Sequence, residues 1–572
     1  MKSFFKYLLV LLSGYVILII SVVIFIGILS DSEPIINDNS YLEMTLSGSI
    51  PEYVTPNPIE ELTGVSNTLD MRKIRENFEK AAVDDRINGI LLNIGFLQIG
   101  YAKVEELQHL INTYRLSGKK IFAYLELGLT RDYLVATACD SVFLPENSNL
   151  FLTGISSEVT FYKGFFDKIG VKADFVHIGE YKNAPDQYTR EDMSDAQRES
   201  LNNIIDQFYD FIINNISEYR NLDAEHVKNL INNKTGFTGK EALENNLVDG
   251  NSYKEDIVKL LRQQSEDPIR VSGATYSGIP ISSLGIRTAS RIAVINIVGT
   301  ISNGNDVDDP IMGKLAGANT IAQNISAAAK SSSTKAIILR IDSPGGSAIA
   351  ADIILNSIRN AAKEKPVIAS ISDYGASGGY YIAAGADTII CSRESLIGSI
   401  GIFAGKFSLG GLYKKLGINS EQLKRGENAA LFSTNSLWSP SERQLMTHLL
   451  NEYYINFVQV VANSRNREYD EIDNIARGRV WSGSDGLKNG LSDTLGTFYD
   501  AIDAAKRMAH IADDESVRLS YYPREKDFFS ELYSFVSLRA HTFNLLSELD
   551  LGVIEQFQNH PLALMPFIIE WK

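Results

Sequence analysis

The chain has 572 residues, of which 44% are hydrophobic and 22% charged, so we expect a globular protein of two or more domains. Its formal net charge of -16 argues against nucleic acid as a partner, because phosphate binding needs a basic face. The two cysteines, Cys139 and Cys391, lie in apolar stretches, which favours small buried side chains and provides neither a disulfide framework nor a cysteine-rich zinc site.

The N-terminus predicts a membrane anchor. Lys2 and Lys6 precede an uncharged, mostly apolar run over residues 7–29, which matches the roughly 20 residues that cross a bilayer core. A cleaved signal peptide usually has an apolar region of only about 7–15 residues and a small-residue cleavage site. We therefore interpret residues 1–30 as a cytoplasmic stub and an uncleaved transmembrane helix, with the body on the opposite side of the membrane.

An internal repeat divides the rest of the chain. Residues 89–94 resemble residues 336–341 at an offset of 247, and self-similarity at one spacing indicates duplication. The same offset pairs Tyr133 with Tyr380, Asp140 with Asp387, Gly170 with Gly417, and Gly179 with Gly426. From these pairs we predict an N-terminal repeat at 41–270, a linker at 271–289, a C-terminal repeat at 290–515 and a helical tail at 516–572.

Each repeat alternates short β-branched runs with helical patterns. In the second repeat, residues 334–341 are typical of a buried strand, 350–362 of a helix and 366–371 of the next strand. Such alternation predicts βαβ units and a mainly parallel sheet covered by helices.

Two glycine-rich loops follow successive predicted strands of the second repeat, at residues 342–347 and 375–380. The second loop carries Ser377 at a strand-to-helix turn, where a hydroxyl is exposed and backbone N–H groups lie beside it. Gly346 in the first loop offers another unobstructed N–H. The loops alone are equally consistent with two tight turns or an anion-binding nest.

Comparison of the repeats favours catalysis. Thr130 stands where the second repeat has Ser377, and residues 97–99 replace the first glycine loop. Conversely, Lys182 of the first repeat aligns with Ala429 of the second. A lone lysine is most often a surface charge, but these complementary losses suggest one composite site. In such a site a serine, which needs an adjacent base, would lie beside a lysine. Burial would lower the pKa of that lysine, so that it could act as the base.

Several motifs together resemble the long, duplicated form of protease IV, also called signal peptide peptidase A. They are Gly179-Glu-Tyr-Lys-Asn-Ala184, Arg190-Glu-Asp-Met-Ser194, Asp342-Ser-Pro-Gly-Gly346, Ala376-Ser-Gly-Gly-Tyr-Tyr381 and Ile397-Gly-Ser-Ile-Gly-Ile-Phe403. The resemblance runs from the anchor to about residue 525. It implies a tandem repeat of an α/β domain of the Clp protease and crotonase type, following one transmembrane helix.

The resemblance also assigns roles. It implies a serine endopeptidase with a Ser-Lys dyad, in which Ser377 is the nucleophile and Lys182 the general base. The N–H groups of Gly346 and Gly378 would form the oxyanion hole, and Ser399 is a candidate for orienting the lysine. Neither a metal nor a cofactor is expected.

The same family implies a homotetramer at the bacterial inner membrane, with its catalytic body on the periplasmic side. Its substrates would be signal-peptide remnants and other apolar peptides. Two alternatives remain at this point: a non-catalytic membrane scaffold that binds peptides with the same fold, and a crotonase-like acyl-CoA enzyme, which would need neither the serine nor the lysine.

Overall fold

The computed structural model describes residue 14 and residues 34–55, 69–262, 267–286, 288–309, 313–524 and 561–565. Apart from Gly14, the predicted anchor at residues 7–29 lies outside these ranges. Within them, no helix combines the length and apolar character needed to cross a bilayer.

The first repeat is built on a five-stranded parallel sheet with the order β4-β3-β2-β1-β8. Its long central strand β2 is buried along almost its whole length, as expected where helices cover a parallel sheet. The strands are β1 (Ser40–Gly48), β2 (Ile87–Leu97), β3 (Lys120–Tyr124), β4 (Ser141–Phe143) and β8 (Ile269–Ser272), and the main helices are α3 (Met71–Val83), α4 (Tyr101–Arg115) and α5 (Thr130–Thr137).

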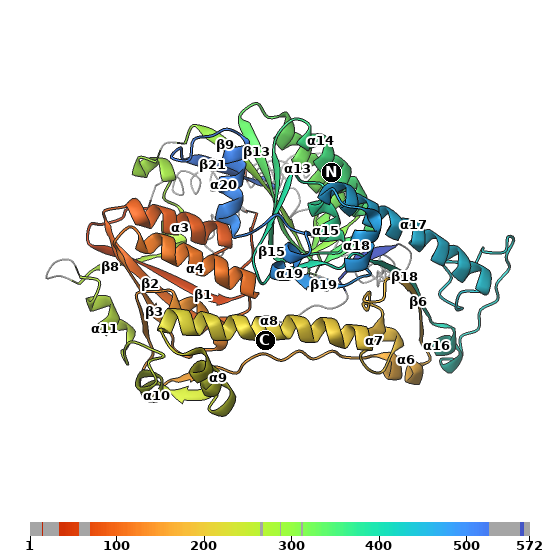
Figure 1. Ribbon diagram of the computed structural model, residues 1–572, viewed down its shortest axis with the longest axis horizontal. Helices are drawn as coiled ribbons and strands as arrows, with labels where there is room; N and C mark the ends of the chain where they lie inside the picture. The colour runs from red at the N-terminus through yellow and green to blue at the C-terminus, as the bar shows by residue number, and fades with distance from the viewer. Residues whose placement is uncertain are drawn as a thin grey trace, which may run out of the picture.

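The second repeat has an eight-stranded sheet whose main path is β19-β17-β15-β13-β9-β21, with β16 and β20 branching from β15. The strands are β9 (Ser290–Val298), β13 (Thr334–Ser343), β15 (Val367–Ala376), β16 (Thr388–Cys391), β17 (Leu396–Gly398), β19 (Val480–Ser482), β20 (Thr494–Leu495) and β21 (Val517–Tyr522). The matching helices are α13 (Ala318–Lys330), α14 (Ala348–Ala362) and α15 (Gly378–Ala383). Figure 1 shows the two sheets, one in the orange first repeat and one in the green second repeat.

The duplication extends to individual hydrogen bonds. Helices α13 and α14 begin 247 residues after α3 and α4, which is the offset found in the sequence. The hydroxyl of Tyr133 donates to the carbonyl oxygen of Leu247 at 2.6 Å, and that of Tyr380 donates to Leu491 at 2.6 Å. Strand β8 pairs in parallel with β1 as β21 pairs with β9, so the two sheets span residues 40–272 and 290–522.

The described parts of the predicted helical tail are strands, which corrects the sequence-based expectation for them. Strand β21 belongs to the second sheet, and Val517, Leu519 and Tyr521 pack alternately against its core. That period of two is a strand pattern. Residues 562–564 form another strand, β22 (Leu562–Leu564). Residues 525–560 and 566–572 lie outside the described ranges.

The predicted linker contains regular structure that packs on the first repeat. It holds α12 (Gly273–Ser277) and the 3₁₀-helix η1 (Ile281–Leu284). Tyr276 is buried, and its hydroxyl donates to the carboxylate of Asp84 at 3.0 Å. The ammonium of Lys80 on α3 donates to the carbonyl oxygens of Tyr276 and Ile279, at 2.8 and 3.1 Å.

A third sheet joins the repeats. Its order is β11-β12-β10-β14-β22-β18-β6, and β6 of the first repeat pairs antiparallel with β18 of the second over their full lengths. Its strands other than β22 are β6 (Lys172–Ile178), β10 (Thr300–Ser302), β11 (Val307–Asp309), β12 (Gly313–Gly317), β14 (Gly345–Ser347) and β18 (Ile402–Ser408). Because β6 lies next to β18, the segment that follows β6 enters the second repeat.

Two long helices also bridge the repeats (Figure 1). Helix α8 (Asp195–Arg220) contacts α5 and also β19, and α17 (Pro440–Arg465) contacts β6 and β18. Each begins at a serine N-cap, Ser194 or Ser439. The remaining elements are α6 (Lys163–Ile169), α7 (Asp186–Thr189), α9 (Ala224–Asn233), α10 (Gly239–Glu244), α11 (Lys254–Lys259), α16 (Gly410–Lys415), α18 (Tyr469–Ile475), α19 (Gly483–Lys488), α20 (Phe498–Met508), β5 (Asn149–Phe151) and β7 (Gly236–Thr238).

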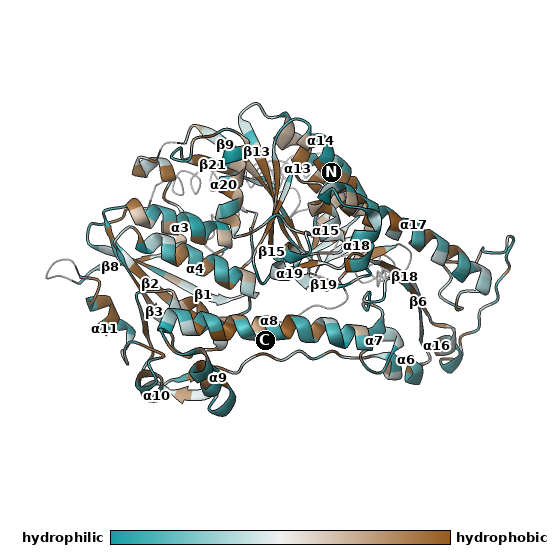
Figure 2. Cartoon of the chain, viewed as in Figure 1, coloured by the Kyte–Doolittle hydropathy of each residue, from teal (hydrophilic) through white to brown (hydrophobic). Residues whose placement is uncertain are grey.

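Each repeat has its own hydrophobic core. Leu92 on β2 and Leu339 on β13 are fully buried at equivalent places in the two sheets. Figure 2 shows hydrophobic strands in the interior and hydrophilic residues on the outer faces of the helices. Burial of these side chains supplies the main driving force for folding, and it fixes the carboxyl ends of β13 and β15, where the glycine-rich loops begin.

Candidate active site

Ser377 lies at the turn between β15 and α15, with φ 55° and ψ -116°. A positive φ is strained for a residue with a side chain and is concentrated at functional sites. The neighbouring glycines permit the turn. A Cβ at Gly379 would lie 2.7 Å from the carbonyl oxygen of Ser343, and one at Gly375 would lie 2.6 Å from the side chain of Ile371. The turn therefore presents the Ser377 hydroxyl at the carboxyl end of the sheet.

The side-chain nitrogen of Lys182 contacts that hydroxyl. Lys182 follows β6, and its Nζ lies 2.7 Å from Ser377 Oγ. It also lies 3.0 Å from both the carbonyl oxygen and Oγ of Ser399. All three side chains have an exposed fraction of 0%. Burial holds the pKa of Lys182 well below its usual value, because desolvation disfavours the charged form.

A short segment of the second repeat holds Lys182 in place. The carbonyl oxygen of Arg477 accepts from Tyr181 N at 2.7 Å, and Arg479 O accepts from Ser399 N at 2.7 Å. Gly478 packs between them so closely that a Cβ there would lie 2.5 Å from the amide nitrogen of Lys182. The backbone of residues 477–479 thus positions the lysine and the serine that contacts it.

The two glycine-rich loops touch beside Ser377. A Cβ at Gly378 would lie 3.2 Å from the amide nitrogen of Gly346, and a Cβ at Gly345 would lie 2.7 Å from the amide nitrogen of Gly378. Gly345 has φ 102°, a conformation that favours glycine. Two backbone amides from separate loops therefore converge next to the hydroxyl, as an oxyanion-binding site requires.

A carboxylate joins the corresponding loops of the first repeat. Asp132 accepts hydrogen bonds from the amide nitrogens of Phe96 and Leu97 at 3.0 and 2.8 Å, and from Leu129 at 3.0 Å. These amides belong to the loops that correspond to the two glycine-rich loops. In this repeat, therefore, the side chain of Asp132 links the two loops beside Thr130.

Sequence reasoning missed a buried ion cluster beneath the site. Lys103 of α4 lies 2.6 Å from Asp342, 3.2 Å from Asp373 and 3.5 Å from Glu52. Burial opposes the charge on Lys103, but the three carboxylates outweigh it and raise the pKa of the lysine well above its usual value. Asp342 opens the first glycine-rich loop, so the first repeat supplies the charge that holds this loop. Asp342 belongs to the motif at residues 342–346 and could be singled out from the sequence, whereas Lys103 lies in none of the motifs.

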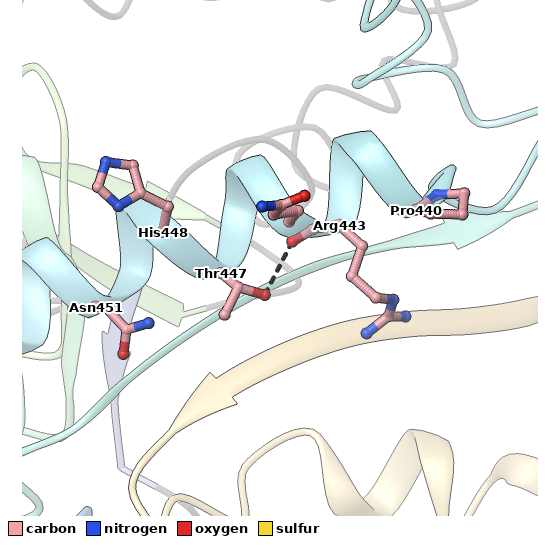
Figure 3. Close-up of a pocket in the computed structure, with 6 residues that line it drawn as sticks. Pro440, Arg443, Thr447, His448 and Asn451 are labelled. Atoms are coloured by element: carbon pink, nitrogen blue, oxygen red, sulfur yellow. Dashed lines mark hydrogen bonds between the residues drawn. The ribbon is translucent and has the colours of Figure 1, made fainter.

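A separate open depression of about 580 Å³ lies on α17 (Figure 3). The Thr447 hydroxyl donates to the carbonyl oxygen of Arg443 at 2.9 Å there. The lining residues are Pro440, Arg443, Gln444, Thr447, His448 and Asn451. None of the predicted site residues lines it.

The fold and site define a duplicated α/β chain with a serine-lysine pair at the junction of its repeats. The model of peptidase family S49 matches the chain twice, at residues 114–267 and 359–512, and the chain belongs to this family. The resemblance expected from the motifs is confirmed, and so is the tandem α/β fold. The chain is a serine protease.

Curated relatives are similar to this chain over most of its length. It is 32% identical to "Serine protease SPPA, chloroplastic" of Arabidopsis thaliana, covering 87% of this chain and 73% of the relative. It is 31% identical to "Protease 4" of Salmonella typhi, covering 78% of this chain and 73% of that relative. Among solved structures, a mutant of a membrane-bound stomatin-specific protease with a substrate peptide matches 44% of this chain and 99% of its own, at 17% identity and a TM-score of 0.27.

Proposed function

We propose that Ser377 is the nucleophile of this protease and Lys182 its general base, with the repeats at 41–270 and 290–515 each supplying one of them. The observation that supports this proposal best is the 2.7 Å contact between Lys182 Nζ and Ser377 Oγ. The contact is buried, and burial lowers the pKa of the lysine. A neutral amine at this distance can accept the hydroxyl proton as the serine attacks a peptide carbonyl.

The surroundings of Lys182 favour that direction of proton transfer. A neutral amine has two N–H groups and one lone pair. The carbonyl oxygen and Oγ of Ser399, both at 3.0 Å, take the two N–H groups, so the lone pair faces Ser377. We propose Ser399 as the residue that orients the base.

The oxyanion would form beside the two glycine-rich loops. We propose that the N–H groups of Gly346 and Gly378 donate to it, because their loops are in contact and preorganised backbone donors stabilise developing negative charge. Proton return from Lys182 to the leaving amine would release the first product. Water, activated by the same lysine, would then hydrolyse the Ser377 ester.

Labelling with a fluorophosphonate probe tests the pair. Wild-type protein should react at Ser377, Ser377→Ala should not, and Lys182→Arg should not, because arginine stays protonated. Lys406 provides a matched control: it is also buried with a lowered pKa, but it donates to the carbonyl oxygens of Leu431 and Ser433. Labelling of Lys182→Arg at the wild-type rate, or loss of labelling in a folded Lys406→Arg, would contradict the proposal.

We propose further that residues 7–29 hold the chain in the bacterial inner membrane with the body outside the cytoplasm. There a homotetramer would degrade signal-peptide remnants and other apolar peptides. The apolar run after Lys2 and Lys6 supports the anchoring. The name of an Enterococcus faecium relative, "Putative signal peptide peptidase SppA", which is 32% identical over 31% of this chain, supports the substrate class. A reporter fused after Lys572 in a Ser377→Ala background should be extracytoplasmic. A cytoplasmic signal would overturn this topology.

A further inference from the structure

The guanidinium group of Arg479 connects the two repeats beside the segment that carries Lys182. Arg479 directly precedes β19 of the second repeat, and its Nη1 lies 2.7 Å from the carboxylate of Glu199 on α8 of the first repeat. The guanidinium carbon also lies over the rings of Tyr181 and Trp481, at 4.9 and 4.4 Å from their centroids. A cation in such a position is attracted to the face of the ring. One side chain therefore joins β19, α8 and the residue before the base.

Tyr181 is the residue through which the Arg479 side chain reaches the base. It directly precedes Lys182, and its hydroxyl donates to the carboxylate of Glu199 at 3.1 Å and accepts from Arg479 Nη1 at 3.4 Å. Glu199 is exposed and contributes little alone, because solvent screens surface ion pairs. The turn at this point is tight, since Lys182 N donates to the carbonyl oxygen of Gly179 at 3.1 Å. A shift of the Tyr181 ring would therefore move the backbone of the lysine.

The backbone of Arg479 acts on the other side of the same amine. Its carbonyl oxygen accepts from Ser399 N at 2.7 Å, and two oxygen atoms of Ser399 lie 3.0 Å from Lys182 Nζ. Trp481 holds the strand that follows, because its indole N–H donates to the carbonyl oxygen of Ile475 at 2.8 Å. Arg479 thus contacts both the residue that precedes the base and the residue that takes the N–H groups of the base.

We propose that Arg479 is a positioning residue for the general base. Its guanidinium group holds Tyr181 and thereby keeps Lys182 in contact with Ser377. The inference rests on the proposed roles of Ser377 and Lys182. Arg479 is assigned no reacting atom and acts only through the position of the amine. Without the guanidinium group, the amine would be free to move away from the serine hydroxyl, and water would reach it.

Kinetics of peptide hydrolysis by Arg479→Ala test the proposal. The substitution keeps the backbone carbonyl oxygen that accepts from Ser399 N but removes the guanidinium group. A displacement of the Lys182 amine by about 1 Å should lower kcat by about 100-fold. KM should stay near the wild-type value, because Arg479 acts on the base and not on the peptide. A wild-type kcat in this variant would overturn the inference.

The pH profile gives a readout that a general loss of stability would not change. The two side chains that contact the amine, those of Ser377 and Ser399, are uncharged, and burial lowers the pKa of Lys182. Water admitted by the loss of Arg479 should raise that pKa, and removal of a neighbouring positive charge acts in the same direction. The acid limb should therefore shift to higher pH in Arg479→Ala. An unmoved limb would overturn the inference and leave the dyad standing, whereas activity in Lys182→Arg would overturn the dyad itself.

A double-mutant cycle tests whether Arg479 acts through Tyr181. Tyr181→Ala should lower kcat about as much as Arg479→Ala does. The double variant should be no slower than either single variant, because both substitutions remove the same contact. Losses of kcat that multiply in the double variant would overturn the assigned route.

Arg443→Ala is the matched control. Arg443, labelled in Figure 3, also belongs to the second repeat, lies over the ring of Trp438 and pairs with Asp174 of the first repeat. Asp174 lies near the start of β6, whereas Lys182 follows the end of that strand. The control should therefore keep the wild-type kcat and acid limb. An equal loss of kcat in Arg443→Ala would show that any contact between the repeats has this effect and would refute the specific role of Arg479.

Discussion

Replacing Ser399 with alanine tests how the base is oriented. The change removes the Oγ that accepts from Lys182 Nζ at 3.0 Å but leaves the Ser399 carbonyl oxygen at the same distance. One such hydrogen bond contributes about 1 kcal/mol, so kcat should fall about 5- to 10-fold. KM should be unchanged because Ser399 is assigned no contact with the substrate. Ser399 has a positive φ of 49°. This backbone conformation strains alanine as much as serine, so the substitution adds no backbone strain.

The pH profile of this variant adds a second readout. Below the pKa of Lys182 the ammonium cannot accept a proton, so activity falls on the acid side. The lost oxygen accepted most strongly from the charged form, so its removal should lower the lysine pKa and shift the acid limb to lower pH. Ser395→Ala is a matched control, because that buried hydroxyl donates to the carbonyl oxygen of Ser372 instead. An unchanged kcat and pH profile in Ser399→Ala would refute the orienting role.

Three further predictions concern the base, the oxyanion loop and the ion cluster. Because burial lowers the pKa of Lys182, kcat/KM should rise through an apparent pKa below 10.5, and Lys182→Arg should be inactive at every pH; activity in this variant would contradict the dyad. Gly346→Val would place a Cβ about 2.0 Å from a neighbouring carbonyl oxygen and should lower kcat about 100-fold through loss of one donor; an unchanged kcat in a folded variant would exclude that donor. Lys103→Met leaves Asp342 buried without its counter-charge and should lower the free energy of unfolding by about 3–5 kcal/mol in urea titrations. Replacement of the exposed Lys163 should change stability little, and equal effects would contradict the role of the cluster.

Local patterns predicted the elements of the second repeat well. The expected strand at 334–341, helix at 350–362 and strand at 366–371 correspond to β13, α14 and β15. Buried parallel strands and amphipathic helices leave strong periodic signals, so these elements are visible in one sequence. The presence of the serine in the second repeat alone and of the lysine in the first repeat alone also indicated, from the sequence, that the two repeats meet at Ser377 and Lys182.

Long-range pairing could not be predicted in the same way. Strands β6 and β18 come from different repeats at non-equivalent positions, and no local period specifies such a partner. The cluster of Lys103, Asp342 and Asp373 depends on the same juxtaposition. The segment at 562–564 is too short and too apolar to distinguish a strand from the end of a helix, which is why its place between β14 and β18 was not predicted.

The division of the proposed dyad between the repeats has a consequence for biosynthesis. Ser377 is translated 195 residues after Lys182, and the backbone at residues 477–479 that clamps the lysine follows another hundred residues later. A nascent chain that has folded only its first half therefore carries a solvated lysine and no nucleophile. Proteolytic competence therefore arises only when both halves have left the ribosome and docked, so the unfinished enzyme cannot cleave peptides.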